Sequence, residues 1–243
     1  SCLMLAAMPV MAAYTGHVYV DKNKNGVFDQ SEKPLAGIKV SDGLNVVETA
    51  ADGSFTLPGH ERERFIFITT PSGYKTFNRH YHKIEKKQSG YDFGLIPYSG
   101  RIRKDGSHRY IHITDTEIFN TENHADWVNN VRDYARNEQA AFIIHTGDIC
   151  YEKGLKAHIK LMNTENMDCP VFYCIGNHDL VKGKYGEELF ESIYGPVYYS
   201  FDAGNVHYVV TPMPGGDHAP GYTSDDVCRW LKNDLAHIRP GTP

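Results

Sequence analysis

Three polar segments, each directly after a run of residues that reads as a buried strand, constrain the fold of this chain more than any other feature. The runs are short, apolar and rich in β-branched or aromatic residues, and they cover residues 110–114, 141–146 and 170–175. An amphipathic helix is predicted between the first two runs, at about residues 123–137. The sequence therefore predicts a β-α-β-α-β unit. Its three polar segments share the carboxyl edge of one sheet, which is the usual ligand-binding edge of open α/β sheets.

The side chains in these segments are suited to divalent metal ions. The carboxylates of Asp115, Glu117 and Asp148 and the carboxamide of Asn177 would form an oxygen-rich cluster at that edge. Hard divalent cations prefer such oxygen ligands. His178 is the next residue in the sequence, and its imidazole can transfer protons near neutral pH. The segments therefore indicate metal-assisted chemistry.

Length and composition are those of an ordinary soluble globular chain with one large or two smaller domains. The chain has 243 residues, of which 41% are hydrophobic and 23% are charged. Its formal net charge of −5 argues against nucleic-acid binding, which would favour a basic surface. A phosphate substrate is still compatible with this charge, because bound cations would reverse the local field. The oligomeric state does not follow from the sequence.

The first 13 residues are apolar and uncharged, and they are too short to span a bilayer. They are typical of the apolar region and small-residue cleavage site of a secretory signal. We interpret residues 1–13 as a signal-peptide remnant and expect a secreted, periplasmic or cell-surface protein without a transmembrane segment. A buried first strand or helix is the alternative. The five cysteines show no zinc-like spacing and are too sparse for a disulfide scaffold.

Residues 14–97 read as short strands separated by turns, with no amphipathic run of helix length. Asp42-Gly43 and Asp52-Gly53 are typical hairpin turns. This pattern predicts a small all-β sandwich. The α/β pattern begins near residue 98, so we predict a division into residues 14–97 and residues 98–243.

A calcium-type loop lies inside the β-rich part. Residues 21–32 follow the pattern D-x-[DN]-x-[DN]-G-x5-E, in which oxygen-bearing side chains alternate so that they can face one cation. The alternative is a polar turn that Asp and Asn side chains close with hydrogen bonds, without a metal. With its neighbouring strands, this part resembles the SdrD B-like or Cna B-like domains of secreted and surface proteins, in which such a loop can bind calcium structurally. The predicted calcium ligands are Asp21, Asn23, Asn25, Asp29 and Glu32.

The order and spacing of the three polar segments resemble the calcineurin-like metallophosphoesterase family, which includes purple acid phosphatases and many phosphodiesterases. The family patterns D-x-H, G-D-x-x-(D/N/Y) and G-N-H-(D/E) align with residues 115–117, 147–151 and 176–179. The resemblance implies an α/β fold that is part of a two-sheet sandwich, here preceded by the small all-β sandwich as in secreted bacterial members. It also implies hydrolysis of phosphate mono- or diesters.

The resemblance assigns a role to each matching residue. Two divalent metal ions (Mn, Zn, Fe or Mg) would occupy a dinuclear site, with Asp148 bridging them, Asp115 on the first ion and Asn177 on the second. A metal-bound hydroxide would attack the phosphate, without a covalent intermediate. His178 would give a hydrogen bond or proton to the leaving oxygen. Asp179 would hold the His178 ring.

Two positions depart from the family pattern. The histidine of D-x-H is Glu117 here. Glu117 either ligates the same metal, which would favour a harder ion such as Mn²⁺ or Mg²⁺, or points away and leaves the site one ligand short. Tyr151 stands where purple acid phosphatases carry an iron-binding tyrosinate. We favour packing or substrate contact for Tyr151 and keep metal ligation as the alternative.

The later family motifs, a lone histidine after a strand and then G-H-x-H, are not found in this sequence. We therefore expect a fragment whose phosphoesterase domain is truncated at its C-terminus. Two functions stay open. One is a metal-dependent phosphoesterase, of which this chain could be an inactive piece. The other is a non-catalytic secreted or surface binding protein that keeps a degenerate phosphoesterase fold. The sequence does not identify the ester or the metals.

Overall fold

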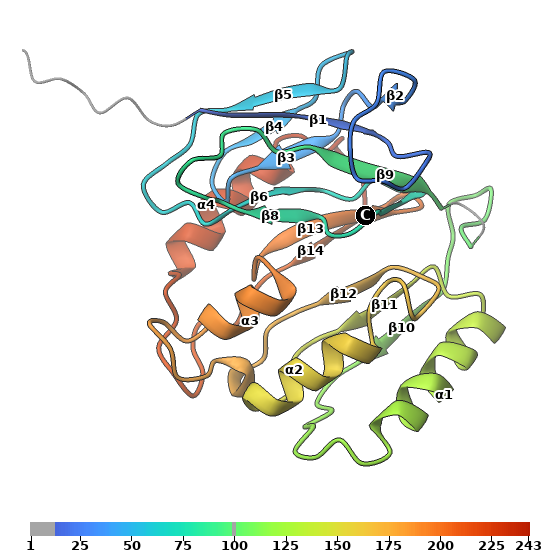
Figure 1. Ribbon diagram of the computed structural model, residues 1–243, viewed down its shortest axis with the longest axis vertical. Helices are drawn as coiled ribbons and strands as arrows, with labels where there is room; N and C mark the ends of the chain where they lie inside the picture. Colours follow the sequence, from blue (N-terminus) through green and yellow to red (C-terminus); the bar gives the residue numbers. More distant parts are fainter. Residues whose placement is uncertain (1–12, 99–100) are drawn as a thin grey trace, which may run out of the picture.

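The computed structural model describes residues 13–98 and 101–243 (Figure 1). Fourteen strands and four α-helices give these residues a mixed α/β fold, as the sequence predicted. The predicted signal-peptide remnant, apart from its last residue, lies outside the described residues. Each helix within the described ranges is too short or too polar to cross a membrane.

Residues 14–97 contain nine strands in two sheets. One sheet has the order β2-β1-β9-β7, with β5 paired to β1, and the other has the order β4-β3-β6-β8. Buried side chains from both sheets form a single core, which includes Val18, Val40, Ile66 and Leu95. The strands are β1 (Tyr14–Val20), β2 (Lys33–Pro34), β3 (Lys39–Ser41), β4 (Val46–Glu48), β5 (Ser54–Leu57), β6 (Phe65–Ile68), β7 (Tyr74–Thr76), β8 (Tyr81–Lys83) and β9 (Phe93–Pro97).

A three-stranded parallel sheet organises the α/β part. Its order is β10 (Tyr110–Ile113), β11 (Phe142–His145) and β12 (Val171–Tyr173). Helix α1 (His124–Asn137) connects the first two strands and α2 (Tyr151–Leu161) connects the last two. This is the predicted β-α-β-α-β unit, and parallel strands need such crossovers.

The remaining elements follow this unit in the chain. They are a short 3₁₀ helix (Asn177–Asp179), α3 (Glu188–Tyr194), the hairpin of β13 (Tyr199–Ala203) and β14 (Val206–Val210), and α4 (Ser224–Leu235). The hairpin lies between the β-rich part and the β10–β12 sheet (Figure 1). Thr223 caps α4, because its hydroxyl accepts a hydrogen bond from the Asp226 amide.

An aromatic core joins the β-rich part to the α/β part. Phe65 and Phe67 of β6 belong to the same buried cluster as Phe172 of β12, Phe201 of β13 and Trp230 of α4. The rings of Phe172 and Phe201 stack with centroids 3.6 Å apart. Burial of large aromatic side chains contributes strongly to packing, so this cluster holds the two parts of the chain against each other.

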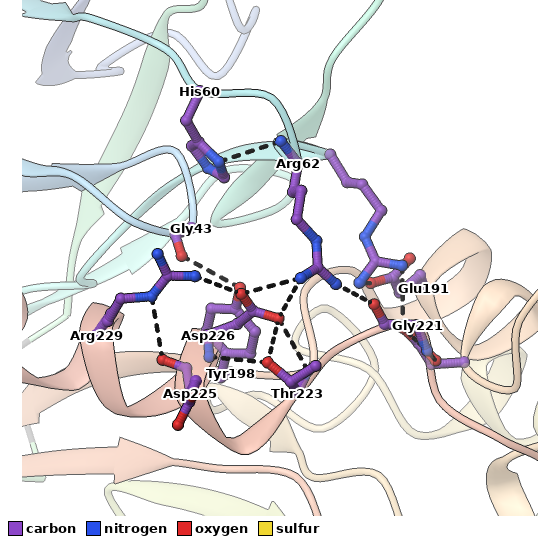
Figure 2. A network of polar contacts seen from close by, with 12 residues as sticks. Gly43, His60, Arg62, Glu191, Tyr198, Gly221, Thr223, Asp225, Asp226 and Arg229 are labelled. Carbon is purple, nitrogen blue, oxygen red and sulfur yellow. Dashed lines mark hydrogen bonds and ion pairs between the residues drawn. The ribbon is translucent and has the colours of Figure 1, made fainter.

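A network of polar contacts also links the two parts of the chain (Figure 2). Arg62, from the β-rich part, lies 3.0 Å from Asp226 of α4 and donates a 2.8 Å hydrogen bond to the carbonyl of Gly221. Arg229 also pairs with Asp226, at 2.8 Å. Because Arg62 and Arg229 are more than half exposed, these pairs contribute little net stability.

Arg64 makes a more buried contact between the same two parts. Its guanidinium lies 3.0 Å from the Glu187 carboxylate and 3.2 Å from that of Glu191, and both carboxylates are almost fully buried. Burial is the main cause that raises the pKa of Glu191 to about 7, although Arg64 opposes it. Removing one partner of a buried pair is costly, so Arg64 ties the β-rich part to the segment around α3.

A buried histidine links the hairpin to α4. The His207 ring lies 2.6 Å from the Asp202 carboxylate through Nδ1 and 2.8 Å from the Asp234 carboxylate through Nε2. Burial lowers the pKa of His207, but the two hydrogen-bonded carboxylates outweigh it and raise the pKa to about 9. The folded protein therefore binds this proton more tightly than the unfolded chain does.

Because His207 binds its proton more tightly in the folded state, the stability of the protein should fall as the pH rises. The contribution of His207 to the free energy of unfolding is fully present below pH 6.5 and is lost as the pH rises through about 9. We predict that His207→Gln removes this fall in stability, measured by urea unfolding at both ends of the window. Replacement of the exposed His218 by glutamine should keep the wild-type dependence. If His207→Gln lost as much stability as the wild type between pH 6.5 and about 9, the pairing of His207 with Asp202 and Asp234 would not be the cause of the pH dependence.

Candidate metal centre

The three polar segments predicted to bind metal are residues 115–117, 147–151 and 176–179, called the first, second and third metal segments. The first and second run side by side at the carboxyl edge of the sheet. The amides of Asp115, Glu117 and Ile118 donate to the carbonyls of Gly147, Asp148 and Ile149, at 3.1, 3.0 and 2.9 Å respectively. These three hydrogen bonds continue the β10–β11 pairing beyond the ends of the strands. The loop that carries Asp115 and Glu117 is thus fixed to the loop that carries Asp148.

The third segment joins through two glycines. A Cβ on Gly147 would lie 2.4 Å from the amide nitrogen of Gly176, and one on Gly176 would lie 2.1 Å from Oδ1 of Asp148. Gly147 also has a φ of +98°, which other residues adopt only under strain. Only glycine therefore fits at these two positions. The amide of His178 donates to Asp148 at 3.1 Å.

Left-handed backbone is concentrated at this edge. Among the described residues, nine other than glycine have a positive φ, and five of them belong to these loops: Asp115, Glu117, Asp148, Cys150 and Tyr151. Each such conformation costs about 1–3 kcal/mol and persists only where the surrounding structure enforces it. Strain of this kind clusters at active sites and ligand sites, so its position here indicates function.

The donor groups at the edge fit a divalent cation. Asp115 and Glu117 are exposed and Asp148 is half-buried, and within the described ranges no lysine or arginine pairs with any of the three. Hard oxygen donors without a basic partner suit Mg²⁺, Mn²⁺ or Zn²⁺. No three carboxylate or imidazole groups of these loops lie within 4.8 Å of one another in the described part of the chain.

His178 has a carboxylate partner that the sequence prediction did not name. Its Nδ1 lies 2.9 Å from Oδ2 of Asp217, a residue in the loop after β14. The hydrogen bond that the His178 ring donates to the Asp217 carboxylate is the main cause that raises the pKa of His178. The same loop is fixed to the third segment, because the Asp217 amide donates to the Asn177 carbonyl at 3.1 Å. No motif in the sequence marks Asp217.

Asp179 has a different place from the predicted one. It is fully buried, and its two oxygens accept the amides of Cys150 at 2.8 Å and Gly176 at 3.0 Å. Both carboxylate oxygens of Asp179 therefore bind backbone amides. The predicted contact of Asp179 with the His178 ring is wrong, because Asp217 occupies that position. Asp179 instead ties the third segment to the start of α2.

His145 is a second residue that sequence reasoning missed as part of the site. It is fully buried, its Nδ1 accepts the amide of Gly147 at 3.2 Å, and its Nε2 lies 3.0 Å from the hydroxyl of Thr116. Burial lowers the pKa of His145 to about 4, so the ring is neutral and Nε2 is the donor. His145 thus fixes both carboxylate loops from beneath.

Tyr151 is the first residue of α2, and its side chain is 43% exposed. Its ring centroid lies 5.8 Å from that of His178. Asn177, which is half-buried, begins the short 3₁₀ helix beside the same histidine. The structure therefore gathers all seven predicted site residues of the α/β part along one edge.

The predicted calcium loop is closed by its own hydrogen bonds. Asp21 accepts the amides of Asn25 at 3.2 Å and Gly26 at 2.9 Å. Glu32 accepts the amides of Lys22 and Asp29, at 2.8 and 3.2 Å. These are the contacts of the metal-free alternative, and calcium binding stays a prediction.

A separate group in the β-rich part brings three ligand-type side chains together. Atoms of Asp42, His60 and Glu63 lie within 4.8 Å of one another. Both ring nitrogens of His60 have backbone partners, the Arg62 amide at 3.3 Å and the Asp42 carbonyl at 3.0 Å. Glu63 accepts the Tyr14 hydroxyl and the His60 amide. These hydrogen bonds account for the group without a metal.

Two family models match the chain. Residues 22–97 match the N terminal of Calcineurin-like phosphoesterase, and residues 108–233 match Calcineurin-like phosphoesterase. No curated protein matches the sequence. The second model covers more than half of the chain and includes all three metal segments. The chain therefore belongs to the calcineurin-like phosphoesterase family.

Proposed function

We propose that this protein hydrolyses phosphate esters with the help of divalent metal ions. The observation that carries the proposal is the joined edge of three loops, which presents Asp115, Glu117 and Asp148 in strained backbone, together with Asn177 and His178. Membership of the phosphoesterase family supports the reaction type. Fixed oxygen donors at one edge are what metal-assisted phosphoryl transfer requires.

The finer proposal is a dinuclear site. Asp148 would be shared between the ions, Asp115 would hold the first and Asn177 the second, and Glu117 would add a carboxylate in place of the family histidine. Such ions lower the pKa of a bound water and offset negative charge on the phosphoryl oxygens. The hydrogen bonds among the loops would keep these donors in place when substrate binds.

His178 would protonate the leaving oxygen of the ester, and Asp217 would orient the His178 ring. The Asp217 carboxylate accepts from Nδ1 of His178 at 2.9 Å and raises the pKa of the ring. It therefore favours the imidazolium, in which Nε2, on the side away from Asp217, also carries a proton. From that position the ring can give a proton to the leaving oxygen. Asp217 is then a positioning residue, since it orients the ring without touching the substrate.

We make three further proposals from the sequence. The division into residues 14–97 and 98–243 is supported by the separate matches of residues 22–97 and 108–233. Export is a proposal from the apolar first 13 residues. Structural calcium at residues 21–32 and a likeness to SdrD B-like or Cna B-like domains are proposals from the loop pattern.

Asp148→Asn tests the metal site. Asparagine can still accept the His178 amide but carries no charge, so we expect metal-dependent hydrolysis of bis(p-nitrophenyl) phosphate to fall by about 100-fold or more. Mn²⁺ affinity, measured by calorimetry, should fall with it. Asp133→Asn, on α1, is the matched control and should change neither. Full activity in Asp148→Asn would show that the site lies elsewhere, and an inactive wild type would favour the non-catalytic binding protein.

Asp217→Ala tests the leaving-group role. An alkoxide needs a proton when it departs and p-nitrophenolate does not, so we expect kcat to fall by about 100-fold for alkyl esters and by less than about threefold for p-nitrophenyl esters. Asp217→Asn keeps an acceptor for His178 and should recover part of the loss. An equal loss for both kinds of ester would mean that Asp217 acts only on the structure of the loop.

A further inference from the structure

A pocket of about 540 Å³ lies between the two parts of the chain, and none of the seven predicted site residues of the α/β part lines it. One side is formed mainly by β7, β8 and the segment between them, and the other by α2, α3, β12 and the loop before β12. The third metal segment, in contrast, follows β12. Pockets of this size at the interface between domains are the usual binding places of small organic ligands.

Aromatic rings give the pocket an apolar wall. The lining includes the rings of Tyr81, Phe172, Tyr173 and Tyr194. Each of the three tyrosine hydroxyls donates a hydrogen bond to a backbone carbonyl of α2, of α3 or of the residue that caps α2. Because the hydroxyls are used in this way, the rings offer the pocket mainly carbon atoms. A planar apolar group would pack favourably against such a wall.

A half-buried lysine lies at this pocket without a carboxylate partner. In the described part of the chain, every lysine is exposed except Lys39 and Lys75. Lys39 pairs with Asp202 at 3.4 Å. Lys75 makes no ion pair with the described residues, and its Nζ lies 5.6 Å from the ring centroid of Tyr98. Partial burial of an ammonium group without a counter-ion is unfavourable, so Lys75 would gain from a bound anion.

Arg79 supplies a second cation at the same pocket. Seven of the ten arginines form ion pairs, but Arg79 forms none with the residues that the structure describes. Its guanidinium instead lies over the ring of Tyr81, 5.4 Å from the centroid. Since Tyr81 belongs to the apolar wall, the charge lies beside the place for a planar group. A guanidinium binds carboxylate and phosphate oxygens through two parallel hydrogen bonds.

The charge of the lining suits a ligand with a single negative charge. Glu165, which is exposed, is the acidic residue of the lining, so Lys75, Arg79 and Glu165 together leave one positive charge. His80 also lines the pocket, and burial lowers its pKa to about 3, so its ring is neutral. Nε2 of His80 is buried and has no hydrogen-bond partner among the described residues. Such atoms are rare and costly, which points to a ligand that supplies a partner.

We propose that this pocket binds a small organic monoanion, a planar apolar group that carries one carboxylate or one singly charged phosphate. Lys75 and Arg79 receive the acidic group, and the aromatic wall holds the planar group. This inference goes beyond the proposed function and does not depend on it. Because both parts of the chain line the pocket, the ligand binds only the folded protein and stabilises the contact between them.

Calorimetry with EDTA present tests the class of ligand. The probes are 2-naphthoate, its neutral counterpart 2-naphthamide, acetate as an anion without a ring, and methyl 2-naphthyl phosphate. We expect saturable binding of a naphthyl anion, and the tighter of the two identifies the acidic group. The naphthamide should bind at least about 10-fold more weakly, and acetate should not bind up to about 10 mM. Equal binding of naphthoate and naphthamide, or no binding of either naphthyl anion up to about 10 mM, would overturn the proposal.

Variants locate the binding. Lys75→Met and Arg79→Gln each remove one charge and should weaken binding of the naphthyl anion about 10-fold. The anion should also raise the Tm of the wild type but hardly that of these variants, whose melting without ligand shows that they are folded. Arg103→Gln, which removes another exposed arginine without an ion pair among the described residues, is the matched control.

Asp148→Asn separates this pocket from the metal centre. With EDTA present it should bind the naphthyl anion as the wild type does, because Asp148 does not line the pocket. Loss of binding in Asp148→Asn, or unchanged binding in both Lys75→Met and Arg79→Gln, would place the anion elsewhere and contradict the inference. Neither result bears on metal-dependent hydrolysis, which the activity of Asp148→Asn tests by itself.

Discussion

The close approach of Gly147 to Gly176 is the constraint on which the rest of the site depends. A Cβ at either position would overlap backbone or the Asp148 carboxylate, so the second and third segments can meet only because both residues are glycine. Once they meet, Asp148 and Asp179 accept amides across the junction. The first segment then adds to the second through three backbone hydrogen bonds.

This arrangement stores strain that other contacts must offset. Five residues other than glycine are held at positive φ along one edge, at a cost of about 1–3 kcal/mol each. His145 and Asp179 restrain the loops from the buried side. The loop of Asp217 continues to Gly221, whose amide donates to buried Glu187 at 2.9 Å. Since Glu187 also pairs with Arg64, the β-rich part is connected to the His178 partner through a short series of polar contacts.

The sequence predicted the sheet edge well because the signal is local. Each metal segment follows an apolar run, and parallel strands bring their carboxyl ends to one edge, so Asp115, Asp148 and Asn177 had to lie near one another. The helices followed from the same reasoning, because parallel pairing demands a crossover between strands.

The partners of the site residues could not be predicted in this way. Asp217 lies 39 residues after His178 in a loop without a periodic pattern, and only the tertiary path of that loop brings the two together. Asp179 follows His178 directly, which suggested a contact with the ring. In the structure its two oxygens instead accept hydrogen bonds from the amides of Cys150 and Gly176. His145 looked like a core residue because it is one; its link to Thr116 depends on the loop geometry.

The central claim is that the joined loops, and no other acidic group of the protein, hold the catalytic metal. Anomalous diffraction from a crystal soaked in Mn²⁺ tests it most directly. The account predicts a strong peak within about 2.2 Å of carboxylate oxygens of Asp148, with Asp115 or Asn177 as a second ligand. A peak at Asp42, His60 and Glu63 or in the loop of residues 21–32, with none at Asp148, would contradict it.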